Sequence, residues 1–220
     1  MDLVANIARV RGVISENVPG RENAITIVAV TKTRLPEDIN KLIDCGIYDI
    51  GENRVQEWLT KRDELRSGFR LHHIGQLQSN KVKYLMGHVH LIHSVDRIAL
   101  LEEISRRSPG NVDILLQVNT AREEQKAGVL AEDLPKLFDS AMAAKEKGVT
   151  LRGFMCIAPL EGGREAAGEV FTQAKTLFDK YGRLASSQGF DTLSMGMSGD
   201  YDIALRCGAN MIRIGSTLFI

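Results

Sequence analysis

Lys32 is a candidate reactive residue, because it follows a run of apolar and β-branched residues. That run, residues 25–30, has the composition of a strand buried on both faces. Pro36 favours a helix soon afterwards, so Lys32 is expected where a parallel strand ends and a loop begins. A partly desolvated lysine there favours the neutral amine, which forms Schiff bases with aldehydes. The alternative is a lysine whose stem lines the strand end and whose ammonium reaches solvent.

Two glycine-containing loops near the other end of the sequence form a second chemical pattern. Residues 195–200 read Met-Gly-Met-Ser-Gly-Asp and open a short helical segment, and residues 215–217 read Gly-Ser-Thr after the last predicted strand. Free N–H groups in such loops, with the Ser198 and Ser216 hydroxyls and the Gly215 main chain, suit an anion. The alternative is that the glycines of both loops serve tight turns only.

The lysine and the two loops are more informative together than apart. Phosphate sites in α/β barrels often use the loops after strands seven and eight, and chemistry takes place at the same end of the strands. A lysine at strand one would then hold an aldehyde covalently while the loops hold its phosphate. The sequence therefore indicates a phosphorylated aldehyde, and pyridoxal 5′-phosphate is the candidate that carries both groups.

Arg213 stands between apolar residues in the last predicted strand, so its charge requires a specific acceptor. A guanidinium beside a pyridine nitrogen would hinder protonation of the ring and weaken the ring as an electron sink. The alternative is an ion pair between Arg213 and a barrel carboxylate such as Glu52.

His72 and His73 are adjacent in a predicted strand, so only one of them can point into a barrel. A single core histidine is more often a hydrogen-bonded packing residue than a ligand. The remaining histidines are scattered and the three cysteines lack metal-ligand spacing, so we expect no metal site.

These residues require a scaffold that brings many strand ends together. Leu3, Ile7, Val10 and Ile14 recur at helical spacing and predict an N-terminal helix over about residues 1–17. Short buried strands then alternate with amphipathic helices. The expected strands are 25–32, 48–53, 71–75, 89–95, 112–118, 151–157, 193–197 and 211–215. The expected helices are 36–44, 55–65, 97–106 with Asp96 as N-cap, 134–147, 165–187 and 200–207.

Eight such strands predict an α/β fold, a single (β/α)₈ TIM barrel that occupies residues 1–220 as one domain. An open, doubly wound sheet is the alternative. No Gly-x-Gly-x-x-Gly pattern follows the first strand, which weakens a dinucleotide-binding interpretation.

Composition narrows the function classes. The chain of 220 residues has 28 basic and 28 acidic residues, so it carries no charge signature for nucleic acid or an anionic membrane. An odd number of scattered cysteines favours a reducing compartment. The first residues resemble neither a signal peptide nor a membrane span, so we expect a cytoplasmic protein.

Several ordered motifs resemble those of the pyridoxal phosphate homeostasis proteins, an alanine-racemase-like barrel family. The motifs run from residue 30 to the end of the chain: Val-Thr-Lys-Thr at 30–33, Gly-Glu-Asn-Arg-Val-Gln-Glu at 51–57, His-His-Ile-Gly-Gln-Leu-Gln-Ser-Asn-Lys at 72–81, Ser-Val-Asp at 94–96, Gln-Val-Asn at 117–119, Lys-Ala-Gly at 126–128, Ser-Met-Gly-Met-Ser-Gly-Asp at 194–200 and Arg-Ile-Gly-Ser at 213–216.

This resemblance implies a fold-type III barrel that binds pyridoxal phosphate. It implies that Lys32 is the Schiff-base lysine and that Arg213 faces the pyridine nitrogen. It assigns the phosphate to Ser198, Gly215 and Ser216, and the pocket lining to Asn53 and His72. The chain departs from the usual motif at Leu71, His73 and Arg54, which stand beside the expected pocket residues in the sequence.

The resemblance also implies a protein that carries, buffers or delivers the cofactor as a cytoplasmic monomer without established turnover. Delivery would make apo forms of pyridoxal-phosphate enzymes its partners. The alternative is a racemase or decarboxylase built on the same barrel. Racemases of this type need an opposing acid/base and an extra β domain, for which the sequence leaves no residues after the eighth strand. Tyr201 is the best candidate for such a group. A lysine-dependent aldolase is a third possibility, but no acid/base pair supports it.

Overall fold

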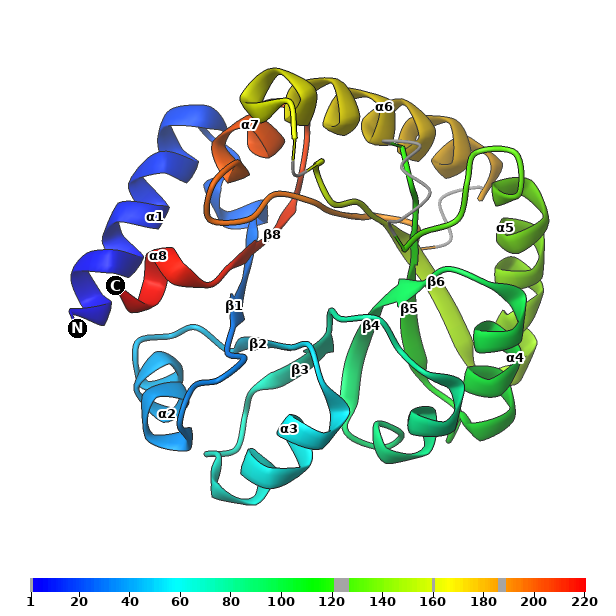
Figure 1. Cartoon of the computed structure of the whole chain (residues 1–220), viewed down its shortest axis with the longest axis horizontal. Helices are drawn as coiled ribbons and strands as arrows, with labels where there is room; N and C mark the ends of the chain where they lie inside the picture. The colour runs from blue at the N-terminus through cyan, green and yellow to red at the C-terminus, as the bar shows by residue number, and fades with distance from the viewer. Residues whose placement is uncertain (1, 121–126, 160, 186–188) are drawn as a thin grey trace.

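The computed structural model describes residues 2–120, 127–159, 161–185 and 189–220. Eight parallel strands close into a barrel in sequence order, and β8 pairs with β1. Figure 1 shows the strands around the centre and the helices on the outside. The predicted (β/α)₈ barrel is confirmed, and the open-sheet alternative is wrong.

Six of the eight strands are shorter than the sequence predicts, because residues expected at their ends lie in loops. Their bounds are β1 Thr26–Val30, β2 Asp49–Glu52, β3 Arg70–His73, β4 Val89–Val95, β5 Val112–Gln117, β6 Val149–Met155, β7 Thr192–Ser194 and β8 Met211–Ile214. Lys32 and Asn53 therefore lie just beyond their strands, in βα loops.

The helices follow the predicted order, with irregular ends. Their bounds are α1 Leu3–Asn17, α2 Pro36–Asp44, α3 Val55–Lys61, α4 Ile98–Arg107, α5 Leu134–Ala143, α6 Gly163–Leu184, α7 Tyr201–Arg206 and α8 Ser216–Phe219. Helices α3 and α5 each continue as a short 3₁₀ segment, Arg62–Glu64 and Ala144–Lys147. The sequence did not predict α8 or the 3₁₀ segment Ser79–Tyr84.

Helix α4 begins without the N-cap that the sequence predicts. Asp96 does not cap α4: the N-cap is Arg97, and the Asp96 carboxylate accepts a hydrogen bond from the Arg97 guanidinium at 2.6 Å. The Asp96 carboxylate therefore pairs with the neighbouring guanidinium, and no side chain among the described residues caps the first turn of α4. The expected end of α6 at Ser187 lies outside the described residues.

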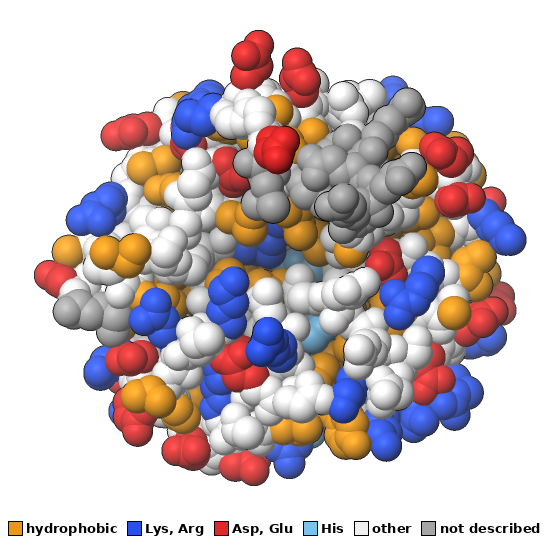
Figure 2. Space-filling view, in the orientation of Figure 1, with side chains coloured by type: hydrophobic (Ala, Val, Ile, Leu, Met, Phe, Trp, Pro, Cys, Tyr) orange, Lys and Arg blue, Asp and Glu red, His pale blue; other side chains and the backbone are white. Residues whose placement is uncertain are grey.

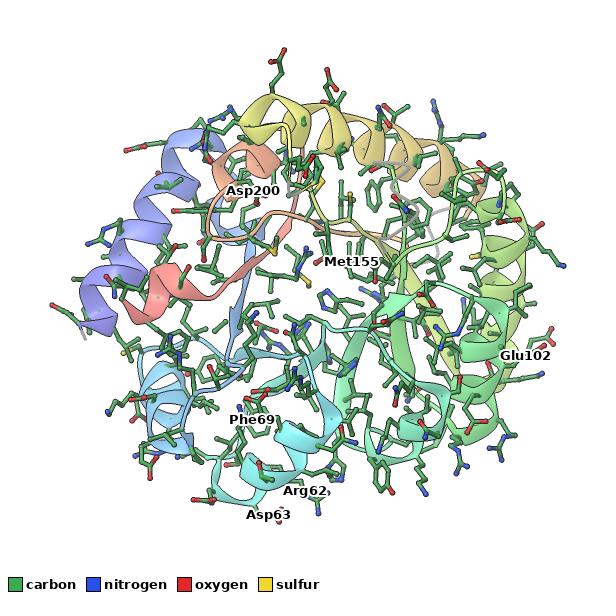
Figure 3. All side chains as sticks on the ribbon, in the orientation of Figure 1. Arg62, Asp63, Phe69, Glu102, Met155 and Asp200 are labelled. Atoms are coloured by element: carbon green, nitrogen blue, oxygen red, sulfur yellow. The ribbon has the colours of Figure 1, made fainter. Side chains whose placement is uncertain are left out.

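The barrel has an apolar outer layer and a mixed interior. Most buried apolar side chains pack between the strands and the surrounding helices. A smaller cluster fills the interior and consists of Val28, Leu91, Leu115, Met155 and Met211. Met155, labelled in Figure 3, lies toward the middle of the ring of strands. The rest of the interior is polar: Asp49, His72, His93, Ser194 and Arg213 are all at least nine-tenths buried.

Helix α1 lies over the end of the chain. The Asn6 side-chain amide donates to the carbonyl oxygens of Leu218 and Ile220, at 3.0 and 2.8 Å. Asn6 is buried, so these bonds fix α1 against α8. Among the described residues, none of the helices is long and apolar enough to cross a bilayer.

Candidate cofactor site at the carboxyl end of the barrel

Lys32 lies at the carboxyl end of β1, next to the loops that follow β8. Strands β1 and β8 are paired, and a Cβ atom built on Gly215 would lie 3.4 Å from Val30 Cβ. The Arg34 guanidinium lies 4.3 Å from the centre of the Phe219 ring in α8. These contacts place the Lys32 loop beside the start of α8. The Lys32 side chain is exposed, contrary to the partial burial that its sequence context predicts.

A buried ion-pair cluster holds the main chain on both sides of Lys32. Lys61 in α3 is 4% exposed, and its ammonium donates to the Thr31 carbonyl oxygen at 2.9 Å. The same ammonium contacts one carboxylate oxygen each of Glu52 and Glu57, at 2.8 and 2.9 Å. Glu57 also accepts the main-chain N–H of Thr33. The groups that precede and follow Lys32 are therefore fixed from beneath the loop.

Thr33 has a φ of +63°, a left-handed conformation that is costly for a β-branched residue. The Thr33–Glu57 hydrogen bond helps to hold this conformation. A turn of this kind changes the direction of the chain directly after Lys32. Burial raises the pKa of Glu52 above its ordinary value, although Lys61 and Thr31 donate to its carboxylate.

The loop after β7 and the start of α8 form a compact cradle. Ser198 Oγ accepts the main-chain N–H groups of Gly215 and Thr217, at 3.2 and 3.4 Å. Gly196 has a φ of +90°, and a Cβ atom there would lie 2.6 Å from Ala204 Cβ. Gly196 is therefore required for the loop to turn onto α7. Asp200, labelled in Figure 3, closes the loop by accepting the Met197 N–H at 2.6 Å.

Arg213 is 3% exposed and lies beneath this cradle. Its guanidinium donates to the carbonyl oxygens of Ser194 and Cys156, at 2.8 and 2.9 Å, and to Ser194 Oγ at 2.8 Å. Burial lowers the pKa of Arg213 to about 10, so the side chain stays charged at neutral pH. The alternative of an ion pair with Glu52 is wrong, because Glu52 contacts Lys61 instead.

Asn53 and His72 occupy different environments. Asn53 Oδ1 is shielded from solvent and has no hydrogen-bond partner among the described residues. Gly75 packs against Asn53 so closely that a Cβ atom on it would lie 2.2 Å from the Asn53 carbonyl oxygen. His72 is 1% exposed, and its two ring nitrogens contact Asp49 and His93. This placement favours support from within the barrel over direct contact with a ligand.

His73 points to the other side of β3, as its position next to His72 predicts. It is 1% exposed, and burial lowers its pKa to about 4. Leu71 packs in the outer apolar layer, and Arg54 is exposed. Leu71 and His73 therefore lie on the opposite face of β3 from the interior.

The mouth of the barrel continues into a cavity of about 400 Å³ beside the β7 loop, lined by the ends of β5 and β6 together with Met197 and Asp200. The Gln117 amide donates to the Ala127 carbonyl oxygen at 2.8 Å, which ties one motif of the sequence to another. Lys126, which belongs to the second motif, lies outside the described residues. Figure 2 shows basic side chains near the centre of this face, with histidine visible between them.

Chemically, the arrangement offers an amine, a cation and anion-binding N–H groups around one opening. Lys32 supplies the amine on a fixed loop. Arg213 supplies a permanent charge within the barrel wall. The cradle at Ser198 supplies N–H groups that a phosphate or carboxylate could accept.

Comparison with known proteins places the chain in a family. Residues 4–220 match the family model for the alanine racemase N-terminal domain. A pyridoxal phosphate homeostasis protein of Aquifex aeolicus is 41% identical over 202 residues, covering 90% of this chain and 87% of the relative. One of Escherichia coli K12 is 33% identical, covering 99% and 96%. The chain belongs to the pyridoxal phosphate homeostasis protein family.

Solved structures agree with this family assignment. PipY of Synechococcus elongatus PCC7942, solved without pyridoxal phosphate, has a TM-score of 0.90 and 32% identity, with full coverage of both chains. The same protein with pyridoxal phosphate bound has a TM-score of 0.84. Alanine racemase of Corynebacterium glutamicum shares the fold alone, at 12% identity and a TM-score of 0.70 over 60% of its length.

Some residues that shape the site were missed by the sequence analysis. Lys61 and Glu57 were not identified, although Glu57 belongs to a family motif and stands four residues before Lys61, a spacing typical of helix ion pairs. His93 and Asp49 carried no recognisable signal. Their partners lie on other strands, far away in the sequence.

Proposed function

We propose that this chain binds pyridoxal 5′-phosphate at the carboxyl end of the barrel and serves in cofactor homeostasis. Lys32 would bond covalently to the aldehyde, which is the reactive group that the cofactor supplies. The N–H groups of Gly215 and Thr217, with the Ser198 and Ser216 hydroxyls, would hold the phosphate. Arg213 would face the pyridine nitrogen, and Asn53 would line the pocket.

The residues present fit this cofactor. Asn53 Oδ1 is a buried acceptor without a partner among the described residues. Two main-chain N–H groups converge on Ser198 Oγ, the kind of donor set that a phosphate oxygen requires. The exposed Lys32 side chain lies just after the neighbouring strand, within a loop that Lys61 and Glu57 hold in place.

The convergence at Ser198 is the observation that carries the proposal. It joins the loop after β7 to the start of α8, directly beside β1, the strand that precedes Lys32. A phosphate bound there leaves the aldehyde end of an elongated ligand free to reach Lys32. The bound PipY structure and the names of the relatives support the same ligand.

We further propose that the chain carries or buffers the cofactor and does not turn over amino acids. A charged Arg213 would keep the ring nitrogen unprotonated, so the ring would stabilise a substrate carbanion poorly. The relatives are named as homeostasis proteins. A cytoplasmic monomer that delivers cofactor to apo enzymes accords with this role.

An amino-acid racemase on the same barrel is the second candidate. The racemase structures share the fold with this chain and support that candidate at the level of architecture. Tyr201 does not favour it, because Tyr201 is 7% exposed and packs in the core rather than at the mouth.

Reduction with borohydride tests the site directly. The protein is incubated with pyridoxal phosphate, reduced, digested and mapped by mass spectrometry. We expect the adduct on Lys32, and loss of the adduct in Lys32→Ala. Lys41→Ala is the matched control, because Lys41 is an exposed lysine of α2 that pairs only with Asp38 among the described residues. An adduct on another lysine that survives Lys32→Ala would refute the assignment.

The phosphate contribution is tested with pyridoxal, which lacks the phosphate. Hydrogen bonds to a charged group contribute about 1.5–3 kcal/mol each. Loss of two such bonds predicts a dissociation constant for pyridoxal that is at least about a hundredfold higher. Equal dissociation constants for the two aldehydes would exclude a phosphate site at Ser198.

A further inference from the structure

A continuous chain of hydrogen bonds crosses the interior of the barrel below the cofactor site. It runs from Arg213 to Ser194 Oγ at 2.8 Å and from there to His93 Nδ1 at 3.0 Å. It continues from His93 Nε2 to His72 Nδ1 at 2.9 Å, and from His72 Nε2 to Asp49 at 2.8 Å. Strands β4 and β7 are not neighbours, so the His93–Ser194 bond spans the interior.

The far end of this chain is anchored at the opposite mouth of the barrel. Arg70 donates to both carboxylate oxygens of Asp49, at 2.7 and 2.5 Å, and its side chain is half exposed. Burial alone would raise the pKa of Asp49, but the hydrogen bonds from His72 and Arg70 outweigh it and hold the pKa at about 2. Asp49 is therefore a carboxylate that only accepts hydrogen bonds.

The two ends together determine the direction of every bond between them. An ionised Asp49 must receive a proton from His72 Nε2, and Arg213 can only donate. The bidentate Arg70 already neutralises Asp49, so a second cation at His72 would leave a net buried charge. Neutral His72 then presents a bare Nδ1, which must accept from His93 Nε2.

His93 completes the assignment. It is fully buried, and burial, together with the nearby charge of Arg213, lowers its pKa well below the ordinary value. Neutral His93 with a proton on Nε2 has a bare Nδ1, which accepts the Ser194 hydroxyl proton. The Ser194 oxygen then offers its lone pairs to Arg213. All members of the chain are satisfied in this one arrangement.

We propose that Asp49, His72, His93 and Ser194 are positioning residues for Arg213, and that Asp49 sets the direction of the whole chain from the opposite mouth of the barrel. The Ser194 hydroxyl is thereby fixed as an acceptor beneath the guanidinium. The consequence for a bound ring rests on the proposed function, because it requires Arg213 to face the cofactor. The direction of the hydrogen bonds between Asp49 and Arg213 does not depend on the proposed function.

The reverse arrangement is the competing one. A proton added to His72 Nδ1 would make His72 donate to His93, and His93 Nδ1 would then donate to Ser194. The Ser194 oxygen would then accept hydrogen bonds from both His93 and Arg213, and the Ser194 hydroxyl would no longer donate to His93. The two arrangements differ in which nitrogen of His93 carries the proton, and this difference can be measured.

The first experiment uses the protein without cofactor. Histidine ¹⁵N resonances separate protonated from bare ring nitrogens, and long-range ¹H–¹⁵N correlations assign them for His72 and His93. We expect both rings to be neutral with the proton on Nε2. A proton on His93 Nδ1, or a doubly protonated His72, would overturn the proposal without any variant.

Variants at the far mouth test whether Asp49 sets the direction. In Asp49→Ala the His93 resonances should change to a mixture of tautomers, although Asp49 does not contact His93. Asp49→Asn retains an acceptor oxygen and should keep the original tautomer. The matched control is Asp191→Ala, which removes an exposed carboxylate just before β7 that pairs with Arg152. An unchanged His93 in Asp49→Ala, or an equal change in Asp191→Ala, would refute the role of Asp49.

The third measurement concerns the ligand. Loss of one well-oriented hydrogen bond to Arg213 should weaken both pyridoxal phosphate and pyridoxal by about threefold to tenfold in Asp49→Ala. The ratio of the two dissociation constants should stay the same, because the cradle at Ser198 is untouched. Affinities unchanged from wild type would refute positioning. If wild type bound neither aldehyde, the proposed function would fail while the tautomer result stood.

Discussion

The main-chain N–H of Gly215 donates to Ser198 Oγ over 3.2 Å, and this bond joins the loop after β7 to the first residue before α8. The N–H groups of Gly215 and Thr217, at the start of α8, thus share one acceptor on the loop after the neighbouring strand. A phosphate oxygen at this position would accept the same N–H, so the cradle is assembled before any ligand arrives.

Gly196→Ala should disrupt this cradle. The added Cβ would lie 2.6 Å from Ala204 Cβ, at a φ of +90° that alanine adopts only with strain. We expect a loss of stability of about 2 kcal/mol and weaker binding of pyridoxal phosphate. Binding of pyridoxal should change less. Chemical denaturation and fluorescence titration measure the two effects.

Gly199→Ala is the matched control for Gly196→Ala. It lies in the same loop, and a Cβ atom there would meet no heavy atom within 4 Å. We expect wild-type stability and affinity. If the two variants behaved alike, the special role of Gly196 would be disproved.

Lys61→Met should destabilise the loop that carries Lys32. The substitution leaves buried Glu52 without its cation and frees the Thr31 carbonyl oxygen. Breaking a buried ion pair in this way costs about 3 kcal/mol or more. Covalent capture of pyridoxal phosphate by Lys32 should also become slower, as measured by stopped-flow absorbance.

The control for Lys61→Met is Lys41→Met. Lys41 makes an exposed pair with Asp38, for which we expect a change below about 1 kcal/mol. A Lys61→Met protein with wild-type stability and capture rate would mean that the cluster does not hold the loop.

Because His73 is buried, we expect the protein to lose stability in mild acid. Its pKa is about 4 in the folded protein against 6.5 for a free histidine, because burial disfavours the charge. Below pH 6.5 the unfolded chain binds a proton at this residue that the folded protein does not bind. The free energy of unfolding therefore decreases by about 1.4 kcal/mol for each unit by which the pH is lowered, down to about pH 4.

His73→Phe removes the side chain that binds this proton in the unfolded chain and keeps an aromatic ring at the site. Between pH 7 and pH 4 we expect the variant to lose less stability than wild type, by up to about 3 kcal/mol, in denaturation curves at each pH. The control is His88→Gln, which removes a histidine with an exposed side chain. Parallel curves for wild type and His73→Phe would contradict the prediction.

Amino-acid turnover is tested by exchange of the α-proton. In heavy water, L- and D-amino acids incubated with the loaded protein should exchange no faster than with free pyridoxal phosphate, as followed by NMR. The charged Arg213 is the reason for this expectation. Sustained exchange that disappears in Lys32→Ala would establish a racemase-like enzyme instead.

The sequence predicts the barrel well because its signals are local. Each short buried strand and each amphipathic helix is visible within about ten residues, and their alternation defines the topology. Lys32, Ser198 and Gly215 were predicted as site residues for the same reason, since each lies shortly after the end of a strand. The errors concern competition between neighbours: Asp96 pairs with Arg97 instead of capping α4.

The hydrogen-bond network in the barrel interior could not be predicted, because its residues do not recur at a regular spacing in the sequence. His93 and Ser194 are 101 residues apart, and only closure of the barrel brings them together. Likewise the acceptors of Arg213 are mainly carbonyl oxygens, which every residue has. Sequence reasoning therefore predicted that Arg213 needs an acceptor but could not identify it.

The bonds from Asn6 to Leu218 and Ile220 also have a consequence for the order of folding. They join positions more than two hundred residues apart, so α1 has no surface to dock on until β8 has closed the barrel against β1. Helix α1 therefore docks only after the last elements of the chain have formed. Contacts of such high sequence separation slow folding. During synthesis, the apolar face formed by Leu3, Ile7 and Val10 would be exposed until that moment, and an intermediate with this face uncovered is prone to aggregate.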